Sequence, residues 1–291
     1  MAEGTALVNL GELAKPATVL IEKISEAVGG VFKPHQIKRI AKAEAEAALI
    51  EAKSEIKITD LHRRAMHRFI NEEAKKQENI EAITAKAIPQ LEDKSQPQKM
   101  DDDWIANFFD KSRIVSDSEM QELWAKVLAG EANAPGTYSK RTVNFIGSLD
   151  KSDAILFTKL CGFACMMGGV TPLIFDVEKK IYADADITFT ALTHLDNIGL
   201  LRFESVAGFA RQGIPKRFGV YYYGTFVWLE FPKETDNQLE VGKALLSQAG
   251  LQLAPICGSK ANPAFLEYVL NRWQDQGLAP FSPYPRQPAG A

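Results

Sequence analysis

The stretch from His35 to Ile88 contains neither glycine nor proline, and this constrains the fold more than any other feature of the chain. Pro34 precedes the stretch and Pro89 follows it, and proline is tolerated at the start of a helix but disfavoured inside one. The residues between them are rich in Ala, Glu, Lys and Arg, which are strong helix formers. As one unbroken helix the stretch would be roughly 80 Å long at about 1.5 Å per residue. We therefore expect a long helical segment that one small domain cannot bury along its whole length.

The apolar residues of this segment form a stripe of mostly small side chains. Their mean spacing is about 3.8 residues, against about 3.5 in a zipper-like coiled coil, which favours a straight or right-handed bundle. The stripe consists of Ile37, Ala41, Ala45, Ala48, Ala52 and Ile56, and it continues on a shifted phase at Leu61, Ala65, Phe69 and Ala74. Small side chains bury little area each, so the preferred interpretation is a homo-oligomer assembled over many turns through residues 35–88. The alternative is a helix that folds back as a hairpin near Thr59 and Asp60.

A basic cluster lies within the same segment and offers a site for phosphate groups, because a basic stripe on a helix is the usual footprint of nucleic-acid binding. Its members are Arg63, Arg64, His67 and Arg68. Acidic residues follow directly, at Glu72, Glu73, Glu78 and Glu81. A solvent-exposed helix face held by salt bridges is therefore the preferred interpretation, and nucleic-acid binding through Arg63, Arg64 and Arg68 is the alternative.

Residues 9–28 predict an amphipathic helix that is interrupted near Pro16 and ended by Gly29 and Gly30. A membrane surface is one partner for such a helix. The segment carries only Lys15 and Lys23 as basic residues, which is a weak footprint for anionic lipid. Packing against another subunit or against its own chain is therefore the preferred interpretation.

Composition narrows the class of protein but names no reaction. With 46% hydrophobic and 24% charged residues and a net charge of −3, the chain has an ordinary globular composition. It contains neither the apolar core of a signal peptide nor a stretch long enough to span a bilayer. Three cysteines cannot build a disulfide framework. We expect a cytoplasmic protein, with association to a membrane surface through residues 9–28 as the alternative.

A polar linker with two prolines, residues 89–103, predicts the domain boundary. After it, Ser116 and Glu119 have the spacing of a capping box that starts a helix. Gly130 stands where a glycine would stop that helix. A further helix is expected from Lys151 to Met167, and together these segments predict a compact helical unit.

Residues 150–257 resemble a winged-helix unit. The resemblance rests on the segment ALTHLDNIGLL (191–201), in which a helix that Asp186 would cap is followed by a strand. One or two further strands are expected between Phe218 and Phe231, broken at Gly224.

Winged-helix units commonly bind DNA through basic and amide side chains. The expected recognition helix, residues 187–198, contains neither lysine nor arginine. The loop that would form the wing supplies Arg211, Lys216 and Arg217, while the net negative charge argues against a large basic surface. A DNA-binding regulator is therefore an alternative function, and a protein-interaction module is preferred.

Catalytic and metal-binding patterns are weak throughout the chain. It lacks HExxH, the phosphate-binding P-loop, GxSxG and a GxGxxG after a strand. Cys161 and Cys165 stand one helical turn apart, but Cys257 lies far away in the sequence, so buried structural cysteines are favoured over a zinc site. We predict a protein that is not an enzyme and holds neither a metal nor a cofactor.

Two stretches, SDSEMQELWAKVLAGE (116–131) and PGTYSKRT (135–142), carry a specific resemblance. They are similar to an uncharacterised bacterial family known only as a domain of unknown function, and the segments QIKRIAKAEA (36–45) and QENI (77–80) are similar to it as well. The general layout, a helical N-terminus before a helical unit, is also similar to that of the abortive-infection alpha proteins, which implies an association with phage defence. Folding explains most of the motif. It does not explain four residues, which are the candidates for a partner-binding surface: Glu131, Ser139, Arg141 and Thr142.

These patterns together predict a mainly α protein with a smaller α+β part. The expected domains are an N-terminal helical oligomerisation segment (1–88), the linker (89–103), and a helical plus winged-helix-like domain (104–291). The expected function is that of a non-enzymatic, homo-oligomeric interaction or scaffold protein.

Overall fold

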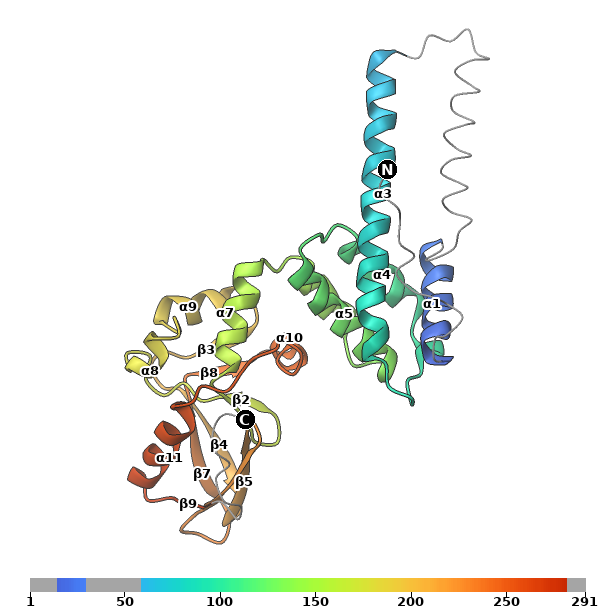
Figure 1. Cartoon of the computed structure of the whole chain (residues 1–291). Coiled ribbons are helices and arrows are strands. Elements are labelled where there is room, and N and C mark those ends of the chain that lie inside the picture. The colour runs from blue at the N-terminus through green and yellow to red at the C-terminus, as the bar shows by residue number, and fades with distance from the viewer. Residues whose placement is uncertain (1–14, 30–58, 282–291) are drawn as a thin grey trace. The chain divides into compact units, whose positions relative to one another are not determined.

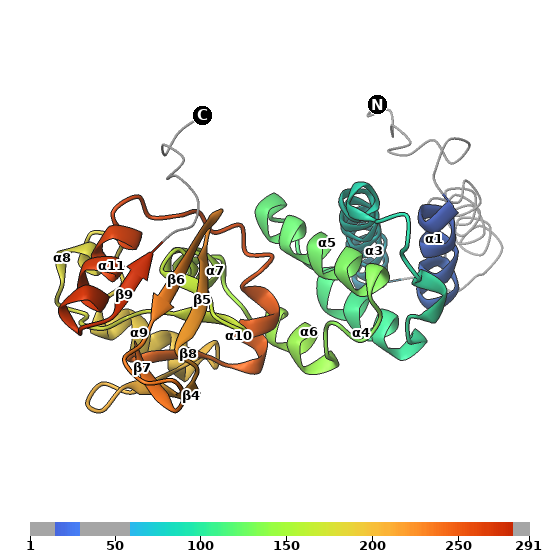
Figure 2. The same ribbon diagram turned by 90° about the horizontal axis from the view of Figure 1, so that it is seen from below.

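The computed structural model describes residues 15–29 and 59–281 (Figure 1). Contacts within the chain divide it into two units, Met1–Ser148 and Leu149–Ala291. The described part of the first unit is helical, and the second unit combines helices with antiparallel strands (Figures 1 and 2). The fold is therefore α+β, with helices dominating its N-terminal and middle regions.

The division after Ser148 differs from the boundary expected at residues 89–103. Those residues fold into the first unit and contain two short 3-10 turns, η2 (Ile88–Gln90) and η3 (Pro97–Lys99). Pro97 and Met100 are buried. The Gln96 N–H donates to the Ala132 carbonyl at 2.8 Å. The polar, proline-containing stretch is thus packed against a helix rather than extended as a spacer.

The described part of the first unit has an aromatic core. It is built from α1 (Lys15–Val28), α3 (Asp60–Ala87), α4 (Asp102–Ser112), α5 (Ser118–Asn133) and α6 (Lys140–Ile146). The Phe108 ring centre lies 5.1 Å from that of Trp104 and 5.1 Å from that of Trp124, and all three side chains are buried. These rings join α4 to α5.

The apolar face of α1 is buried inside this unit. Its buried residues include Ala17, Leu20, Ile21 and Ile24, and the helix lies against α4 and η3. Lys23 pairs with Asp102 at the start of α4. The expected helix therefore packs on its own chain from Lys15 onward, and residues 9–14 lie outside the described residues. Among the helices that the structure describes, none is both long and apolar enough to cross a bilayer.

α3 begins at Asp60, so an unbroken helix from His35 to Ile88 is wrong. Thr59 has an extended backbone and is the N-cap of α3; its Oγ1 accepts a hydrogen bond from the His62 N–H. The helix start falls at the position that the hairpin alternative names, while residues 35–58 themselves lie outside the described residues.

Both ends of α5 differ from the sequence prediction. Asp117 rather than Ser116 is the N-cap, because its Oδ1 accepts from the N–H groups of Glu119 and Met120, both at 3.0 Å. Gly130 does not end the helix, which continues to Asn133. Its missing side chain makes room for another residue instead: a Cβ at Gly130 would lie 2.7 Å from Cε2 of the Tyr138 ring.

The second unit contains a five-stranded antiparallel sheet in the order β2-β1-β5-β6-β9. Its strands are β1 (Ala164–Met166), β2 (Val170–Pro172), β5 (Arg217–Tyr222), β6 (Thr225–Glu230) and β9 (Ala279–Phe281). β5 and β6 lie side by side (Figure 2), with Val220 opposite Val227. Tyr223 and Gly224 turn this hairpin, and both have positive φ, 38° and 89°, as a tight two-residue hairpin loop requires. The predicted break at Gly224 is confirmed.

Two shorter ladders complete the strands of this unit. β3 (Leu201–Phe203) pairs with β8 (Ala244–Leu246), and β4 (Phe209–Ile214) pairs with β7 (Asn237–Gly242). The helices are α7 (Lys151–Cys161), α8 (Lys180–Ala183), α9 (Phe189–Asn197), α10 (Gln248–Leu253) and α11 (Phe265–Asp275). The predicted helix followed by a strand is present as α9 and β3, but β3 pairs with β8 and not with a strand between Phe218 and Phe231. Residues 204–243 between those strands form β4 to β7 rather than a short wing.

Two helix ends in this unit also require correction. α7 ends at Cys161 instead of Met167, because residues 164–166 form β1 and pair with β2. Thr188 rather than Asp186 is the N-cap of α9. Asp186 has a positive φ of 64°.

Candidate interaction surface

The first turns of α3 extend beyond the helices that hold the rest of it (Figure 1). None of residues 60–78 is buried, and the buried residues of α3 begin at Asn79. From there to Ala87 the helix packs against α5. We refer to residues 60–78 as the α3 projection. A helix of this length is marginally stable alone in water, so the projection stands to gain stability from a partner.

The α3 projection carries an apolar face that continues the packed face of the same helix. The Leu61 and Phe69 side chains are 65% and 63% exposed. At about 100° per residue, the stripe of Leu61, Ala65 and Phe69 lies on the same side as the buried Ile83. Met66, also exposed, borders the stripe. Large apolar side chains at helical spacing on an exposed face are typical of a helix that packs against another helix.

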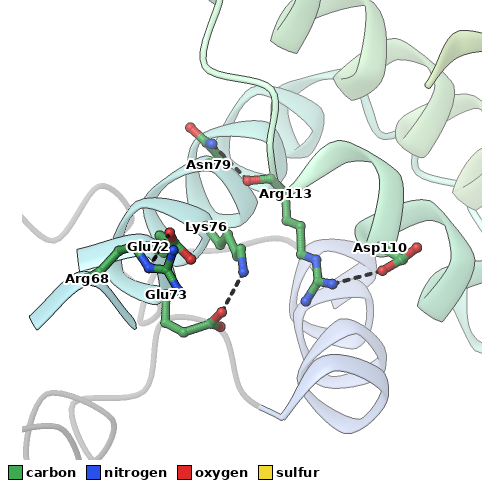
Figure 3. A network of polar contacts seen from close by, with 7 residues as sticks. All are labelled: Arg68, Glu72, Glu73, Lys76, Asn79, Asp110 and Arg113. Carbon is green, nitrogen blue, oxygen red and sulfur yellow. Dashed lines mark hydrogen bonds and ion pairs between the residues drawn. The ribbon is translucent and has the colours of Figure 1, made fainter. Parts of the chain in front are cut away.

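A clamp of two buried amide side chains, Asn79 and Gln121, holds α3 at the base of the projection, and Figure 3 shows the contact of Asn79 with Arg113. Asn79 is 3% exposed; its Nδ2 donates to the Arg113 carbonyl at 2.8 Å and lies 3.3 Å from the Ser116 Oγ. Gln121 Nε2 donates to Asn79 Oδ1 at 3.3 Å and to the Val115 carbonyl at 3.0 Å. A buried polar group left unpaired costs about 1–3 kcal/mol, so these bonds select which turn of α3 meets the loop before α5.

The arginines of the α3 projection lie beside carboxylates of the same helix. Arg63 and Arg64 are 3.6 and 3.8 Å from Asp60, and Arg68 is 3.5 Å from Glu72 (Figure 3). Exposed pairs of this kind contribute little free energy, so a charged partner would replace them at little cost, but each of the three arginines that were candidates for phosphate contacts has a carboxylate of its own helix beside it. The arrangement fits the salt-bridged, solvent-exposed face that the sequence favours.

Arg211 and His194 of the second unit also have partners within that unit. Arg211 donates from Nη1 to the Met167 carbonyl, and its guanidinium carbon lies 5.2 Å from the centre of the Phe218 ring. His194, on the helix expected to read DNA, has its Nε2 2.7 Å from Asp153 Oδ1. Both side chains therefore join elements of the fold.

The other two wing cations pair with glutamates. Lys216 Nζ lies 2.5 Å from Glu234 Oε1, and this contact raises the pKa of the lysine. Arg217 lies 3.9 Å from Glu230 on the neighbouring strand. A nucleic acid that bound Arg211, Lys216 and Arg217 would have to replace contacts that these side chains already make.

Glu131 holds the loop that follows α5. Its side chain is 4% exposed, and its two carboxylate oxygens accept from the N–H groups of Gly136 at 2.6 Å and Tyr138 at 2.8 Å. Burial, together with the nearby Glu131 carboxylate, raises the pKa of Tyr138 to about 12. Glu131 thus positions a loop, and both of its oxygens are engaged in doing so.

Two of the other partner-binding candidates start α6. Ser139 is its N-cap and accepts through Oγ from the Thr142 N–H at 3.2 Å, while Thr142 is 1% exposed. Arg141 is exposed on the first turn of α6. Ser139 and Thr142 therefore have roles in folding, like Glu131, and Arg141 is left as the surface candidate of the four.

The spacing of the cysteines in the sequence does not predict which of them lie near each other in the structure. Cys161 ends α7 and Cys165 lies in β1, so the helical register that would bring them together is lost. Cys161 interacts with Cys257 instead, since each of these two thiols shifts the pKa of the other. Within residues 15–29 and 59–281, no three His, Cys, Asp or Glu side chains gather in a way that could hold a metal ion.

Sequence reasoning missed the clamp residues Asn79 and Gln121. The signal that was available is their position in QENI (77–80) and SDSEMQELW (116–124), two of the segments that carry the family resemblance. The structure brings these two segments together.

A protein-family model described as "Protein of unknown function (DUF2806)" matches residues 63–270. The matched span is more than half of the chain and runs from the first turns of α3 into α11. No curated protein and no solved structure matches the chain.

Proposed function

We propose that the chain, which belongs to the family of proteins of unknown function DUF2806, is a non-enzymatic interaction protein that assembles as a homo-oligomer through the α3 projection. The observation that carries the proposal is the exposed stripe of Leu61, Ala65 and Phe69, which lies on the same side of α3 as the packed Ile83. A face that is packed at one end and exposed at the other supports the proposal that a second helix covers the exposed end, and we propose that this helix belongs to another copy of the chain.

The charge distribution of α3 favours a second copy of the chain as that partner. The first turns are net basic, with Arg63, Arg64 and Arg68, and the turns after them are net acidic, with Glu72, Glu73, Glu78 and Glu81. Two copies of α3 in antiparallel orientation bring the basic part of each opposite the acidic part of the other. An antiparallel pair with two-fold symmetry is self-complementary and closes as a dimer.

Oligomeric state tests this proposal directly. The full chain, of 32.2 kDa, is passed through size-exclusion chromatography with light scattering over a range of concentrations. We expect a mass that is a multiple of 32.2 kDa. Replacing both Leu61 and Phe69 by Glu should lower that mass toward the monomer, because it places two carboxylates on the covered face.

The matched control replaces His67 and Asn71 by Glu. Both residues are exposed and lie on the opposite side of the same helix, so the control adds the same charge without touching the stripe, and its mass should equal that of the wild type. A monomeric wild type at every concentration would overturn the proposal. It would favour the hairpin alternative, in which residues 35–56 of the same chain cover the stripe.

DNA binding is the second candidate function, and the observation that favours it is the succession of α9 and the paired strands β3 and β8. It is tested by a mobility shift at low salt with the full chain. A salt-dependent shift that is lost in the Lys216→Ala/Arg217→Ala variant would support it, since phosphate contacts weaken steeply with salt. Absence of a shift at low salt would dismiss it.

We further propose phage defence as the biological setting, on the resemblance of the chain's layout to that of the abortive-infection alpha proteins. Phage should form fewer plaques on a bacterial host that expresses the chain than on the same host expressing the Leu61→Glu/Phe69→Glu variant. Equal plaque counts would remove this part of the proposal. A peripheral membrane role is disfavoured, because the described part of the expected membrane helix buries Leu20, Ile21 and Ile24 in the fold.

A further inference from the structure

Cys257 lies in a loop that packs against the end of α7, where Cys161 is located, although the two cysteines are far apart in the sequence of the second unit. Cys161 is the last residue of α7 and is 2% exposed. Cys257 lies in the loop between α10 and α11 and is partly exposed. Each of the two thiols shifts the pKa of the other, and both cysteines are free.

Polar contacts on both sides hold the two thiols in this arrangement. Thr158 Oγ1, on α7, donates to the Cys257 carbonyl at 3.2 Å. The Tyr223 hydroxyl donates to the Cys161 carbonyl at 3.1 Å and lies 2.5 Å from the Ser259 Oγ. The loop that carries Cys257 is therefore attached to the end of α7 by contacts other than the thiols themselves.

The same surroundings differentiate the two sulfur atoms. The hydrogen bond from Cys161, followed by those from Ser259, lowers the pKa of Cys257 to about 6. Burial opposes this shift, and the Ala254 carbonyl, 3.2 Å from the sulfur, stabilises the protonated thiol. The pKa of Cys161 is raised, first because its proton is held by Cys257 and then by burial. Reactive cysteines occur in such partly exposed sites rich in hydrogen-bond donors.

We propose that Cys257 and Cys161 form a dithiol that reacts with hydroperoxides, with Cys257 as the attacking thiol and Cys161 as the resolving thiol. The proposal rests on the hydrogen bonds that attach the Cys257 loop to the end of α7, on the burial of Cys161 and on the partial exposure of Cys257. It is independent of the assembly through α3.

The reaction takes place in two steps. The Cys257 thiolate attacks one oxygen of hydrogen peroxide; an S–O bond forms, the O–O bond breaks, and the leaving hydroxide takes a proton to become water. Cys257 is thereby oxidised to a sulfenic acid. The Cys161 sulfur then attacks the Cys257 sulfur; the S–S bond forms, the S–O bond breaks, and the hydroxide leaves as water with the proton of Cys161. Two thiols and one peroxide give one disulfide and two waters.

The experiment treats the reduced full chain with a small excess of hydrogen peroxide and measures intact mass and free thiols. The wild type should lose about 2 Da and two of its three thiols, with peptide mapping joining Cys161 to Cys257. In Cys161→Ser, Cys257 should gain about 16 Da as a sulfenic acid that dimedone traps. In Cys257→Ser, oxidation should slow at least about tenfold.

Cys165→Ser is the matched control. Cys165 is buried, and burial raises the pKa of its thiol to about 12, so this variant should oxidise like the wild type. The wild-type rate should fall as the pH drops below about 6 and the Cys257 thiolate takes up a proton. Retention of all three thiols in the wild type, a disulfide that includes Cys165, or an unchanged rate in Cys257→Ser would overturn the proposal.

Discussion

Residues 60–78 and residues 79–87 belong to one helix and share one apolar face, yet only the second part is buried. The second part meets α5 and is held by the clamp of Asn79 and Gln121. The first part has apolar side chains at the same spacing, and its arginines pair along the helix. Periodicity thus identifies the apolar face of a helix. Hydrogen bonds between side chains of different elements determine which part of that face packs against the rest of the unit.

The largest difference between the two parts should appear when one apolar side chain is truncated in each. Ile83→Ala should destabilise the first unit by about 2–5 kcal/mol, because Ile83 is fully buried against its neighbours. Leu61→Ala should change the stability of a monomeric chain by less than about 0.5 kcal/mol. Hydrogen exchange of the α5 amides measures the stability of this unit without interference from the other. Similar losses for the two variants would mean that the α3 projection is packed in the monomer.

The clamp provides the next test of the comparison. Asn79→Ala removes the donor to the Arg113 carbonyl and the acceptor for Gln121, which should cost about 1–3 kcal/mol because buried polar groups are left unpaired. Asn71→Ala, at an exposed position of the projection, should be nearly neutral. Urea unfolding followed by exchange at α5 measures both. A neutral Asn79→Ala would show that packing alone sets the position of α3.

A smaller effect is expected at the start of the helix. Thr59→Ala removes the N-cap that accepts from the His62 N–H, which should destabilise the first turn by about 0.5–1 kcal/mol. Exchange of the amides of residues 62–66, the first of the helix with hydrogen-bond partners, should accelerate while that of α5 stays the same. Thr59→Ser keeps the hydroxyl and should restore slow exchange. A change at α5 in Thr59→Ala would contradict the separation of the two parts.

The smallest effect is expected from the exposed ion pairs. Arg68→Ala removes the pair with Glu72, and exposed pairs contribute about 0–1 kcal/mol. In the monomeric Leu61→Glu/Phe69→Glu background, thermal unfolding should be unchanged within about 0.5 kcal/mol, at low salt and at high salt alike. In the otherwise wild-type chain, the antiparallel pairing of α3 predicts an additional, salt-dependent loss, because Arg68 then lies opposite acidic residues of a second copy. The same small effect in both backgrounds would contradict that pairing.

Local features were largely predictable from the sequence. The α+β class, the N-terminal amphipathic helix and the turn at Gly224 follow from periodicity and from residues with strong backbone preferences. Helix ends were less predictable, because contacts with other parts of the fold decide where a helix stops. Gly130 lies inside α5, where Tyr138 occupies the space that a side chain would fill. α7 ends early because residues 164–166 pair with β2.

Contacts between distant segments were not predictable from spacing. The sequence offers four residues between 131 and 142 as a binding surface, because capping and packing patterns do not account for their presence. In the structure, three of them hold a loop or start a helix. Cys161 was compared with Cys165 because the two are near in sequence, whereas its neighbour is Cys257. Such contacts depend on which distant segments the tertiary fold brings together, and the periodicity of a single sequence does not reveal this.

The insertion of residues 204–243 between β3 and β8 has a consequence for the order in which the second unit folds. The β5–β6 hairpin closes through a two-residue loop, and local hairpins form in about 1–10 μs. Pairing of β3 with β8 must close a much longer loop, residues 204–243. The chain therefore loses more conformational entropy before the contacts of this ladder can form and offset that loss. The hairpin should therefore form first and shorten the effective loop, leaving the β3–β8 ladder as the late, rate-limiting step.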